Sequence, residues 1–509
     1  MKWNKILLLV ANYRCTGYDF YDSAFPPLAL EYIAAYVEDL VDVIILDSKA
    51  DNLSLKQVKK KIEEYGPDLV GLSVPVSSAI NDVLLYAKIA KDFGCTTVIG
   101  GWHPTLAVEQ TLSSPWIDIL VRGEGEFTFR ELIEKGTPEN INGLSYKTNG
   151  KLIHNPDRPF VKNLDELKFP TRHLVKQYKY KAFNMNCDAI ETSRGCPQAC
   201  RFCSTHVVYK RSWRPRSVEN VIEELEIVSK NKKISDVFFV DDNILVNMKR
   251  IEKLCLEIIR AKRERRIKKH LHFFFQGRLD SMARYPEITK LMGKAGFWLV
   301  LVGVEATDNK GLKNVEKGCN MENIRKGIEV LHESGIIVMG NVIIGANLDD
   351  TVEDVLITIK RTRELTLDLP SFTLLTPFPA TGFYVELKEK NQLLTEDYSK
   401  YNWLTPVIKT QNFSPKVLRK LLFLGFHYVG FYGGDWFTKW NLLRRGIKSR
   451  GFKYILHPGR AYRTVKSYFT WRKIVMENIK DLNKELRNQL LLGNVNDMIE
   501  LKQAIIKGS

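Results

Sequence analysis

Hydrophobic residues in the first 135 positions gather in short runs separated by longer amphipathic stretches. The continuous apolar runs are typical of strands that are buried on both faces, and the stretches between them have the 3.6-residue period of helices. Such alternation predicts a doubly wound parallel α/β sheet with helices on both faces. The expected strands are 5–11, 41–46, 69–74, 97–99 and 117–121, and the expected helices are 55–65, 79–93 and one that begins at Pro26-Pro27 and buries Leu30, Ile33, Val37 and Leu40.

A connecting region follows this first domain. Residues 144–154 alternate around Asn149-Gly150, which is a strong signal for a two-residue hairpin turn. Residues 156–170 carry prolines and charges, as connectors do. We therefore place the first domain at 1–140 and a hairpin with a linker at 141–185.

From about residue 186 the alternation of strands and helices resumes, and it predicts a second α/β domain at 186–385. Ser217 is a candidate N-cap for a helix over 217–230, whose apolar residues share one face. Six strands are expected: 189–192, 237–240, 272–276, 298–302, 338–344 and 372–376.

The C-terminal region, 386–509, becomes helical in pattern beyond residue 412. An apolar segment over 418–431 is interrupted by Gly425 and ends at Gly433-Gly434. Residues 436–475 then hold eleven Lys and Arg residues, no acidic residue and many interleaved aromatic residues. This composition fits a surface against anionic lipid headgroups. RNA, or helices with a solvated cationic rim, would explain it as well.

Composition narrows the class of protein. Of the 509 residues, 44% are hydrophobic and 27% are charged, which is typical of globular domains. The net charge of +17 favours an anionic partner or a solvated basic surface. The eight cysteines show no pairing rhythm, and no run reaches the roughly 20 apolar residues that span a bilayer. We therefore expect a cytoplasmic protein, or one that touches a membrane peripherally.

Three of the cysteines form the most specific motif of the chain. Cys196, Cys200 and Cys203 have the spacing C-x-x-x-C-x-x-C, with Phe202 before the last cysteine. Three thiolates on one loop can hold three irons of a [4Fe–4S] cluster and leave the fourth iron open. The alternatives are a zinc site or three unrelated thiols. No second C-x-x-C pair is present to complete a tetrahedral zinc site.

At these residues the chain resembles the radical SAM superfamily. The resemblance implies a partial (β/α)6 barrel, S-adenosylmethionine (SAM) bound to the open iron, and its reductive cleavage to a 5′-deoxyadenosyl radical. It also implies an external one-electron donor such as a ferredoxin or flavodoxin. It places SAM contacts at the strand ends, on Asp241, Asp242, Gln276, Arg278, Glu305, Gly340 and Gly345.

The two aspartates and the loop after Gly345 each have a feature that differs from the family pattern or has another explanation. Either aspartate alone is as well explained as the N-cap of the next helix. The loop Gly345-Ala-Asn-Leu-Asp-Asp-Thr351 departs from the Gly-x-Pro-Gly-Asp-Thr of many members, so we expect a different shape there.

The first domain carries Pro-Pro-Leu-Ala-Leu near residue 28, Gly-Pro-Asp-Leu-Val-Gly-Leu-Ser at 66–73, Gly-Gly-Trp-His-Pro-Thr at 100–105 and Val-Arg-Gly-Glu-Gly-Glu at 121–126. In these motifs it resembles the cobalamin-binding domain that precedes many radical SAM domains. Glycines admit a large flat ligand, and hydroxyl groups can anchor it. Asp-x-His-x-x-Gly, which ligates cobalt from below in many cobalamin proteins, does not occur in residues 1–140. An empty, degenerate domain is therefore the alternative. The residues that the resemblance assigns to cobalamin are Ser73, Ser77, Gly100, Gly101, His103, Thr105, Gly123 and Glu124.

The resemblance includes hopanoid methylases and archaeal lipid-modifying enzymes of similar layout. It implies a cobalamin-dependent radical SAM enzyme that methylates an unactivated carbon of a small-molecule or lipid-like substrate. Radical cyclisation, ring contraction or carbon–carbon coupling on a lipid or tetrapyrrole-type substrate shares every motif. A tRNA-modifying enzyme and a non-catalytic cobalamin or cluster sensor are further alternatives, with a nucleic-acid partner less favoured. No single acid–base residue stands out, so the catalytic residues are not assigned.

Overall fold

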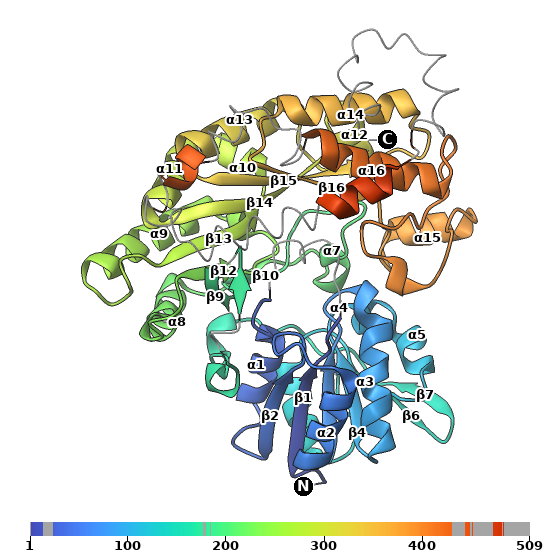
Figure 1. The fold of residues 1–509 in the computed structure, drawn as a ribbon. Coiled ribbons are helices and arrows are strands. Elements are labelled where there is room, and N and C mark those ends of the chain that lie inside the picture. Colours follow the sequence, from blue (N-terminus) through green and yellow to red (C-terminus); the bar gives the residue numbers. More distant parts are fainter. Residues whose placement is uncertain are drawn as a thin grey trace.

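The computed structural model describes residues 2–13, 24–176, 180–183, 185–429, 443–447, 450, 472–480 and 482. Two seven-stranded sheets dominate it, one from each half of the chain. Figure 1 shows the N-terminal sheet below the larger second sheet, with helices on the faces of both. The predicted fold class, a doubly wound α/β unit followed by a partial barrel and a helical C-terminal region, is confirmed. The domain boundaries proposed from the sequence stay a prediction.

The first sheet has the strand order β2-β1-β3-β4-β5-β6-β7. Its first five strands are parallel and the last two are antiparallel, so all five predicted strands are confirmed. The strands are β1 (Lys5–Val10), β2 (Asp42–Asp47), β3 (Leu69–Ser73), β4 (Thr96–Gly100), β5 (Ile119–Val121), β6 (Leu144–Thr148) and β7 (Lys151–His154). The helices are α1 (Leu28–Ala35), α2 (Leu55–Tyr65), α3 (Ile80–Asp92), α4 (Trp102–Leu106), α5 (Val108–Ser113) and α6 (Glu126–Lys135).

Two local expectations in this sheet have different outcomes. The hairpin is confirmed, because Asn149 and Gly150 have φ angles of 47° and 74°, as a two-residue turn with both residues left-handed requires. The helix after Pro26-Pro27 does not reach Leu40. It ends at Ala35, where the amide of Tyr36 bonds the carbonyl of Ile33 three residues back and the chain continues in turns.

The second sheet has the order β16-β15-β14-β13-β12-β9-β8. Its six parallel strands are those predicted, although β9 and β16 begin about three residues earlier than expected; β8 adds a short antiparallel strand. The strands are β8 (Lys181–Ala182), β9 (Met185–Ile190), β12 (Asp236–Phe239), β13 (His272–Gly277), β14 (Phe297–Glu305), β15 (Ile337–Ile344) and β16 (Leu369–Leu374).

Helices cover the outer face of this second sheet, and its strands bury aromatic residues on both faces. Phe239, Phe273 and Phe297 belong to the large core shared with the helices, whereas Phe238 stacks on Phe274 at 4.7 Å in a separate cluster. Ser217 caps its helix as predicted, by accepting a hydrogen bond from Asn220. The helices are α8 (Val218–Lys230), α9 (Met248–Arg263), α10 (Leu279–Arg284), α11 (Pro286–Ala295), α12 (Asn309–Asn314), α13 (Met321–Glu333), α14 (Val352–Glu364) and α15 (Gly382–Glu389).

The described part of the C-terminal region packs against the second sheet. Helix α16 (Pro415–Val429) runs unbroken through Gly425, which the sequence predicted to interrupt it. The glycine serves packing instead, because a Cβ there would lie 3.2 Å from the ring of Phe372. Within the described residues, no helix is both long enough and apolar enough to cross a bilayer.

Two arginines of the basic segment 436–475 form ion pairs with buried carboxylates. Arg445 donates to Asp368 at 2.7 Å, just before β16, and Arg450 donates to Asp236 at 2.9 Å, where β12 begins. Both aspartates are buried. The two arginines therefore neutralise buried carboxylates where two strands of the second sheet begin. Most of that segment lies outside the described residues.

Candidate functional site

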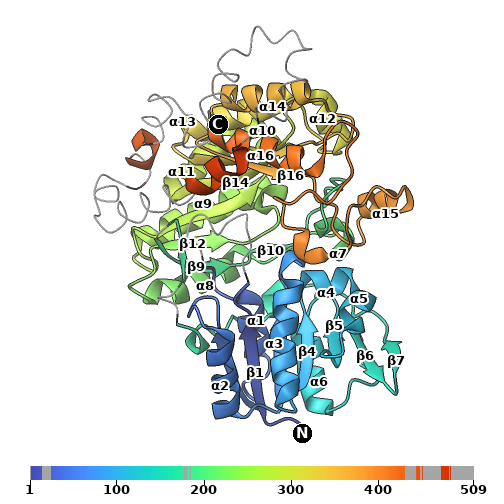
Figure 2. The same ribbon diagram turned by 45° about the vertical axis from the view of Figure 1, so that its right-hand side comes forward.

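A cavity of about 650 Å³ lies where the carboxyl ends of the two sheets face each other. Its wall combines residues from the loops after β3, β4 and β5 with residues from the loops after β9 and β12 and from the end of β13. Figures 1 and 2 show α4 and the short helix α7 (Thr205–Val208) at this junction. Both halves of the chain therefore contribute strand ends, the usual ligand sites of parallel sheets, to one space.

The first sheet brings most of its predicted residues to this cavity. Among the residues assigned to cobalamin, those that line it are Ser73, Ser77, Gly100, Gly101, Thr105, Gly123 and Glu124. Gly101 has φ 105°, and a Cβ there would lie 2.8 Å from the carbonyl oxygen of Val74, so only glycine fits. The Thr105 hydroxyl donates to the Gly101 carbonyl at 2.8 Å and accepts from the Gly123 amide at 3.1 Å. The loops after β4 and β5 are thus tied together.

His103 does not line the cavity. Its ring is fully buried, with Nδ1 at 3.0 Å from the Ser77 hydroxyl and Nε2 at 3.0 Å from the Gln110 side-chain oxygen. Burial lowers the pKa of His103 to about 4, so the ring is neutral at physiological pH. The histidine supports Ser77 from behind.

The three cysteines lie on the loop between β10 (Ser193–Arg194) and α7. The Cys203 amide donates to the Cys200 carbonyl at 3.0 Å, which curls the loop. Asn243 Nδ2 lies 3.9 Å from the sulfur of Cys196, and Arg278 Nη1 lies 3.9 Å from that of Cys200. Burial raises the pKa of Cys203 to about 11. Two donors therefore face sulfur atoms from the strand ends.

Asp241 and Asp242 follow β12 and differ in their surroundings. Asp241 is buried, and its carboxylate accepts hydrogen bonds from the Thr192 amide at 3.0 Å, the Thr192 hydroxyl and Ser193. Asp242 lines the cavity and accepts from the Gly195 amide at 3.2 Å. Burial raises its pKa to about 6. Neither aspartate is a helix cap, because Asn243 caps the next turn instead.

The other residues predicted for SAM are dispersed. Gln276 lines the cavity, whereas Arg278 donates to Asp280 at 2.9 Å and to the carbonyl of Lys317 at 2.7 Å. Glu305 has φ 65°, a strained value for a residue with a side chain, and its carboxylate accepts from the Lys317 ammonium at 2.9 Å. Only Gln276 and Asp242 of the predicted SAM residues line the cavity.

The two predicted glycines lie away from this space. A Cβ at Gly340 would meet the side chain of Leu367 at 2.6 Å, in the core that the strand shares with the helices. Gly345 has φ 67°, and a Cβ there would lie 3.1 Å from Leu418 of α16. Both positions are explained by packing, and their contact with SAM stays a prediction.

Comparison with known proteins identifies the family. The model of the radical SAM superfamily matches residues 190–362, and that of the B12 binding domain matches residues 21–133. An uncharacterized methyltransferase of Pyrococcus horikoshii is 35% identical over 439 residues, covering 85% of this chain and 93% of that protein. The chain belongs to the radical SAM superfamily, in the group with a B12-binding domain.

Further relatives of this radical SAM enzyme are named for different activities. An anaerobic magnesium-protoporphyrin IX monomethyl ester cyclase of Rubrivivax gelatinosus is 30% identical and covers 80% of this chain and 73% of its own. A hopanoid C-3 methylase of Methylococcus capsulatus is 28% identical, with 76% and 73% covered. A radical SAM methyltransferase from Kitasatospora setae, TsrM, shares the fold with a TM-score of 0.63 at 18% identity, covering 88% of this chain and 99% of its own.

The family implies a [4Fe–4S] cluster and SAM for the radical SAM domain and cobalamin for the B12-binding domain. The cysteine loop fits a cluster, because N–H donors approach two of its sulfur atoms, as is common around iron–sulfur ligands. In the described part of the chain no three His, Cys, Asp or Glu side chains are grouped as ligands of a single ion. Cys196, Cys200 and Cys203 share the loop 196–203, in which the Cys203 amide bonds the Cys200 carbonyl.

The cavity fits an amide-rich ligand such as cobalamin. Glu126 begins α6, lines the cavity and is buried, yet its Oε2 has no hydrogen-bond partner among the described residues. A buried carboxylate oxygen without a donor is costly, and a ligand amide would supply one. The glycines of the neighbouring loops leave room for the backbone to approach.

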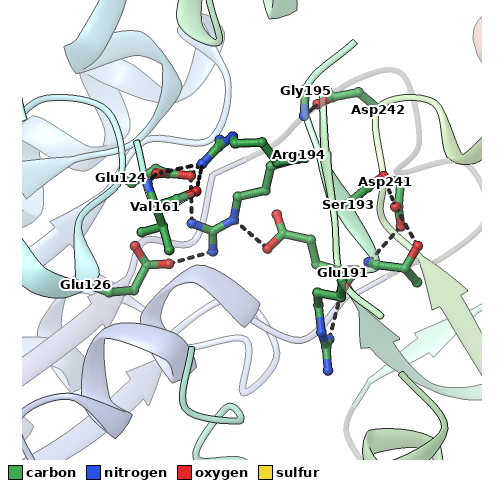
Figure 3. Close-up of polar contacts among 12 residues, drawn as sticks. Glu124, Glu126, Val161, Glu191, Ser193, Arg194, Gly195, Asp241 and Asp242 are labelled. Atoms are coloured by element: carbon green, nitrogen blue, oxygen red, sulfur yellow. Dashed lines mark hydrogen bonds and ion pairs between the residues drawn. The ribbon is translucent and has the colours of Figure 1, made fainter. Parts of the chain in front are cut away.

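Two residues of this radical SAM enzyme were missed in the sequence analysis. Glu126 and Arg194 both line the cavity, and they contact each other at 2.6 Å across the two halves of the chain. Glu126 ends the stretch Arg122-Gly-Glu-Gly-Glu126 and Arg194 lies in Ser193-Arg-Gly-Cys196, but nothing in either stretch indicates that the other residue is its partner. Figure 3 shows the contact.

Gly195 provides a test of the loop geometry. It has φ 88°, and a Cβ there would lie 2.3 Å from the backbone oxygen of Ser212. We expect Gly195→Ala to destabilise the loop by about 2 kcal/mol or more and to lower the iron bound after anaerobic reconstitution. Iron and sulfide analysis measures this, with Gly150→Ala as the control, because Gly150 also has a positive φ but no atom near its Cβ position. Equal iron content in the two variants would contradict it.

Proposed function

We propose that this chain is a cobalamin-dependent radical SAM methyltransferase that methylates an unactivated carbon of a hydrophobic, lipid-like substrate. The observation that carries the proposal is the single cavity lined by strand ends of both sheets. A methyl group held by one domain and a radical generated in the other can reach one substrate only if the two sites share a space.

The proposed roles follow from the positions of the side chains. Cys196, Cys200 and Cys203 would hold the cluster, and Asp242 is a suitable partner for the ammonium group of SAM because it is the aspartate that lines the cavity. When bound, the cluster with SAM supplies a carbon radical and cobalamin supplies a methyl group. The chain itself orients these groups and excludes water.

Asp241 would act indirectly, by binding the residues that precede the cysteine loop. Its carboxylate binds the backbone of Thr192 and the side chains of Thr192 and Ser193, immediately before the cysteine loop. Arg278 faces Cys200 and is anchored by Asp280 and the carbonyl of Lys317. These residues would fix the loop and tune the sulfur atoms, and an external one-electron donor completes the requirements of the reaction.

A hydrophobic substrate is supported by the wall of the cavity and by one relative. Apolar side chains from the second half of the chain, among them Val208, Val240, Phe378 and Trp403, line the space. Phe378 and Trp403 pack edge to face at 5.6 Å. The relative named hopanoid C-3 methylase acts on a lipid by its name. A peripheral membrane contact stays a prediction, since most of residues 436–475 lie outside the described residues.

Ring formation is the second candidate, because the relative named magnesium-protoporphyrin IX monomethyl ester cyclase is 30% identical. A cyclase would use the same radical and would leave the carbon count of its substrate unchanged. The two candidates therefore differ in whether a methyl group from SAM appears in the product.

One experiment separates them. The enzyme is reconstituted anaerobically with iron, sulfide and cobalamin, and is incubated with a reductant, methyl-deuterated SAM and either a total lipid extract or a porphyrin ester. We expect a labelled lipid together with 5′-deoxyadenosine. A porphyrin product without label would favour the cyclase. Cobalamin and cluster binding without SAM turnover would favour a sensor.

A further inference from the structure

Arg194 connects the two halves of the chain at the cavity. It is buried and belongs to Ser193-Arg194-Gly195, the residues immediately before the first cysteine. Its Nη1 donates to Glu124 at 3.0 Å and its Nη2 donates to Glu126 at 2.6 Å, both across the interface. Its Nε donates to Glu191 at 2.8 Å, just after β9. Figure 3 shows one guanidinium among three carboxylates from two domains.

The neighbours of Arg194 are held from the opposite side. The Ser193 hydroxyl donates to Asp241, and the Gly195 amide donates to Asp242 at 3.2 Å. Three consecutive residues therefore tie the start of the cysteine loop to the end of β12 and to the loop after β5. The loop after β5 also supplies Gly123 and Glu124 to the cavity wall.

A second arginine supports the same contact. Arg214 donates to Glu124 at 2.8 Å and packs over the rings of Phe160 and Tyr209. Glu124 is thus held by two arginines, and it also accepts from the Val161 amide at 2.8 Å. Glu126 differs, because Arg194 is the cation with which it forms an ion pair in the described chain.

We propose that Arg194 is a positioning residue that sets the spacing between the cobalamin-binding loop 123–126 and the cysteine loop 196–203. The inference rests on the proposed function, since it assumes cobalamin in the first domain and a cluster on the cysteines. Only arginine can do this, because its planar fork directs three nitrogens to three acceptors, whereas a lysine ammonium is a point charge on a flexible stem.

The test compares Arg194→Lys with Arg130→Lys in the full reconstituted protein. Arg130 pairs with Asp39 and Glu134 and donates to the carbonyl of Tyr36, all in the first domain. We expect Arg194→Lys to keep its iron and sulfide and to bind cobalamin about tenfold more weakly in an absorbance titration, since charge-assisted hydrogen bonds to the loop are lost. Arg130→Lys should bind cobalamin as the wild type does.

A second variant tests the partner. Glu126→Gln should weaken cobalamin binding, and the loss in the double variant Arg194→Lys/Glu126→Gln should be smaller than the product of the two single losses, because the two changes share the Arg194–Glu126 contact. Losses that multiply would overturn the proposal. Wild-type affinity in Arg194→Lys would overturn it too, as would loss of the cluster in that variant. A wild-type protein that binds no cobalamin would overturn the proposed function as well.

Discussion

We expect Cys200→Ala to abolish reductive cleavage of SAM. With two thiolates left, the cluster loses a protein ligand, and we expect 5′-deoxyadenosine formation to fall more than about 100-fold, beyond what loss of a supporting partner usually costs. Cys196→Ala and Cys203→Ala should behave in the same way. Product is measured by chromatography after anaerobic reconstitution and reduction, and iron is measured on the same samples.

Cys319 is the informative control for this series. It is half-buried, it lies outside the motif, and it interacts electrostatically with Arg278 and Cys200. If the cluster keeps one iron open for SAM, Cys319→Ala retains both iron and SAM cleavage. Loss of the cluster in Cys319→Ala would mean that a fourth thiolate fills that corner, and the proposed chemistry would fail.

Replacing Glu31 with glutamine stabilises the protein at alkaline pH. Glu31 lies on α1 and is fully buried, and neither carboxylate oxygen has a hydrogen-bond partner among the described residues. Nearby Arg172 is already paired with Asp188 at 3.1 Å and Glu224 at 2.6 Å. Burial therefore raises the pKa of Glu31 from 4.5 to about 8.

The sign of the effect follows from linkage. The folded state holds this proton up to about pH 8, whereas the unfolded state releases it near pH 4.5. The contribution of the Glu31 proton to the free energy of unfolding is therefore fully present below pH 4.5 and is lost as pH rises through about 8. Glutamine has no proton to lose, so Glu31→Gln should be more stable than wild type by on the order of 5 kcal/mol above that pH.

Urea unfolding at about pH 6 and about pH 9 measures the difference. The exposed Glu64, which pairs with Lys60 on α2 at 3.6 Å, provides the control Glu64→Gln, for which we expect little change at either pH. A pH dependence of Glu31→Gln identical to that of the wild type would show that the proton is not held.

The sequence predicted the parts of this fold that depend on local patterns. Buried apolar runs identified the five parallel strands of the first sheet and the six of the second, and Asn149-Gly150 identified the hairpin. It did not predict that α1 ends at Ala35 or that α16 continues through Gly425. Gly425 illustrates the reason for this failure. The glycine lets the helix pack closely against Phe372, and this contact could not be predicted because Phe372 is distant in the sequence.

In the candidate site, too, residues in local motifs could be predicted from the sequence, whereas residues that depend on distant contacts could not. Gly101 and Gly123 could be assigned to strand ends from the sequence, because each lies within two residues of the end of a strand, and both line the cavity. Their contact with cobalamin stays a prediction. His103 could not be separated from the cavity lining, since its burial depends on Gln110 and on packing with Tyr398. Arg194 and Glu126 are 68 positions apart, and only the assembled domains bring them together.

The ion pairs of Arg445 and Arg450 imply an order in which the two halves of the chain fold during synthesis. Asp236 and Asp368 are buried where their strands begin, so the second unit lacks the arginine partners of these two carboxylates until residues 445 and 450 have left the ribosome. The first unit draws its strands from residues 5–154 and has all of them much earlier. Nascent chains arrested before residue 443 should thus have an amino-terminal unit that resists proteases and a second unit that proteases cleave.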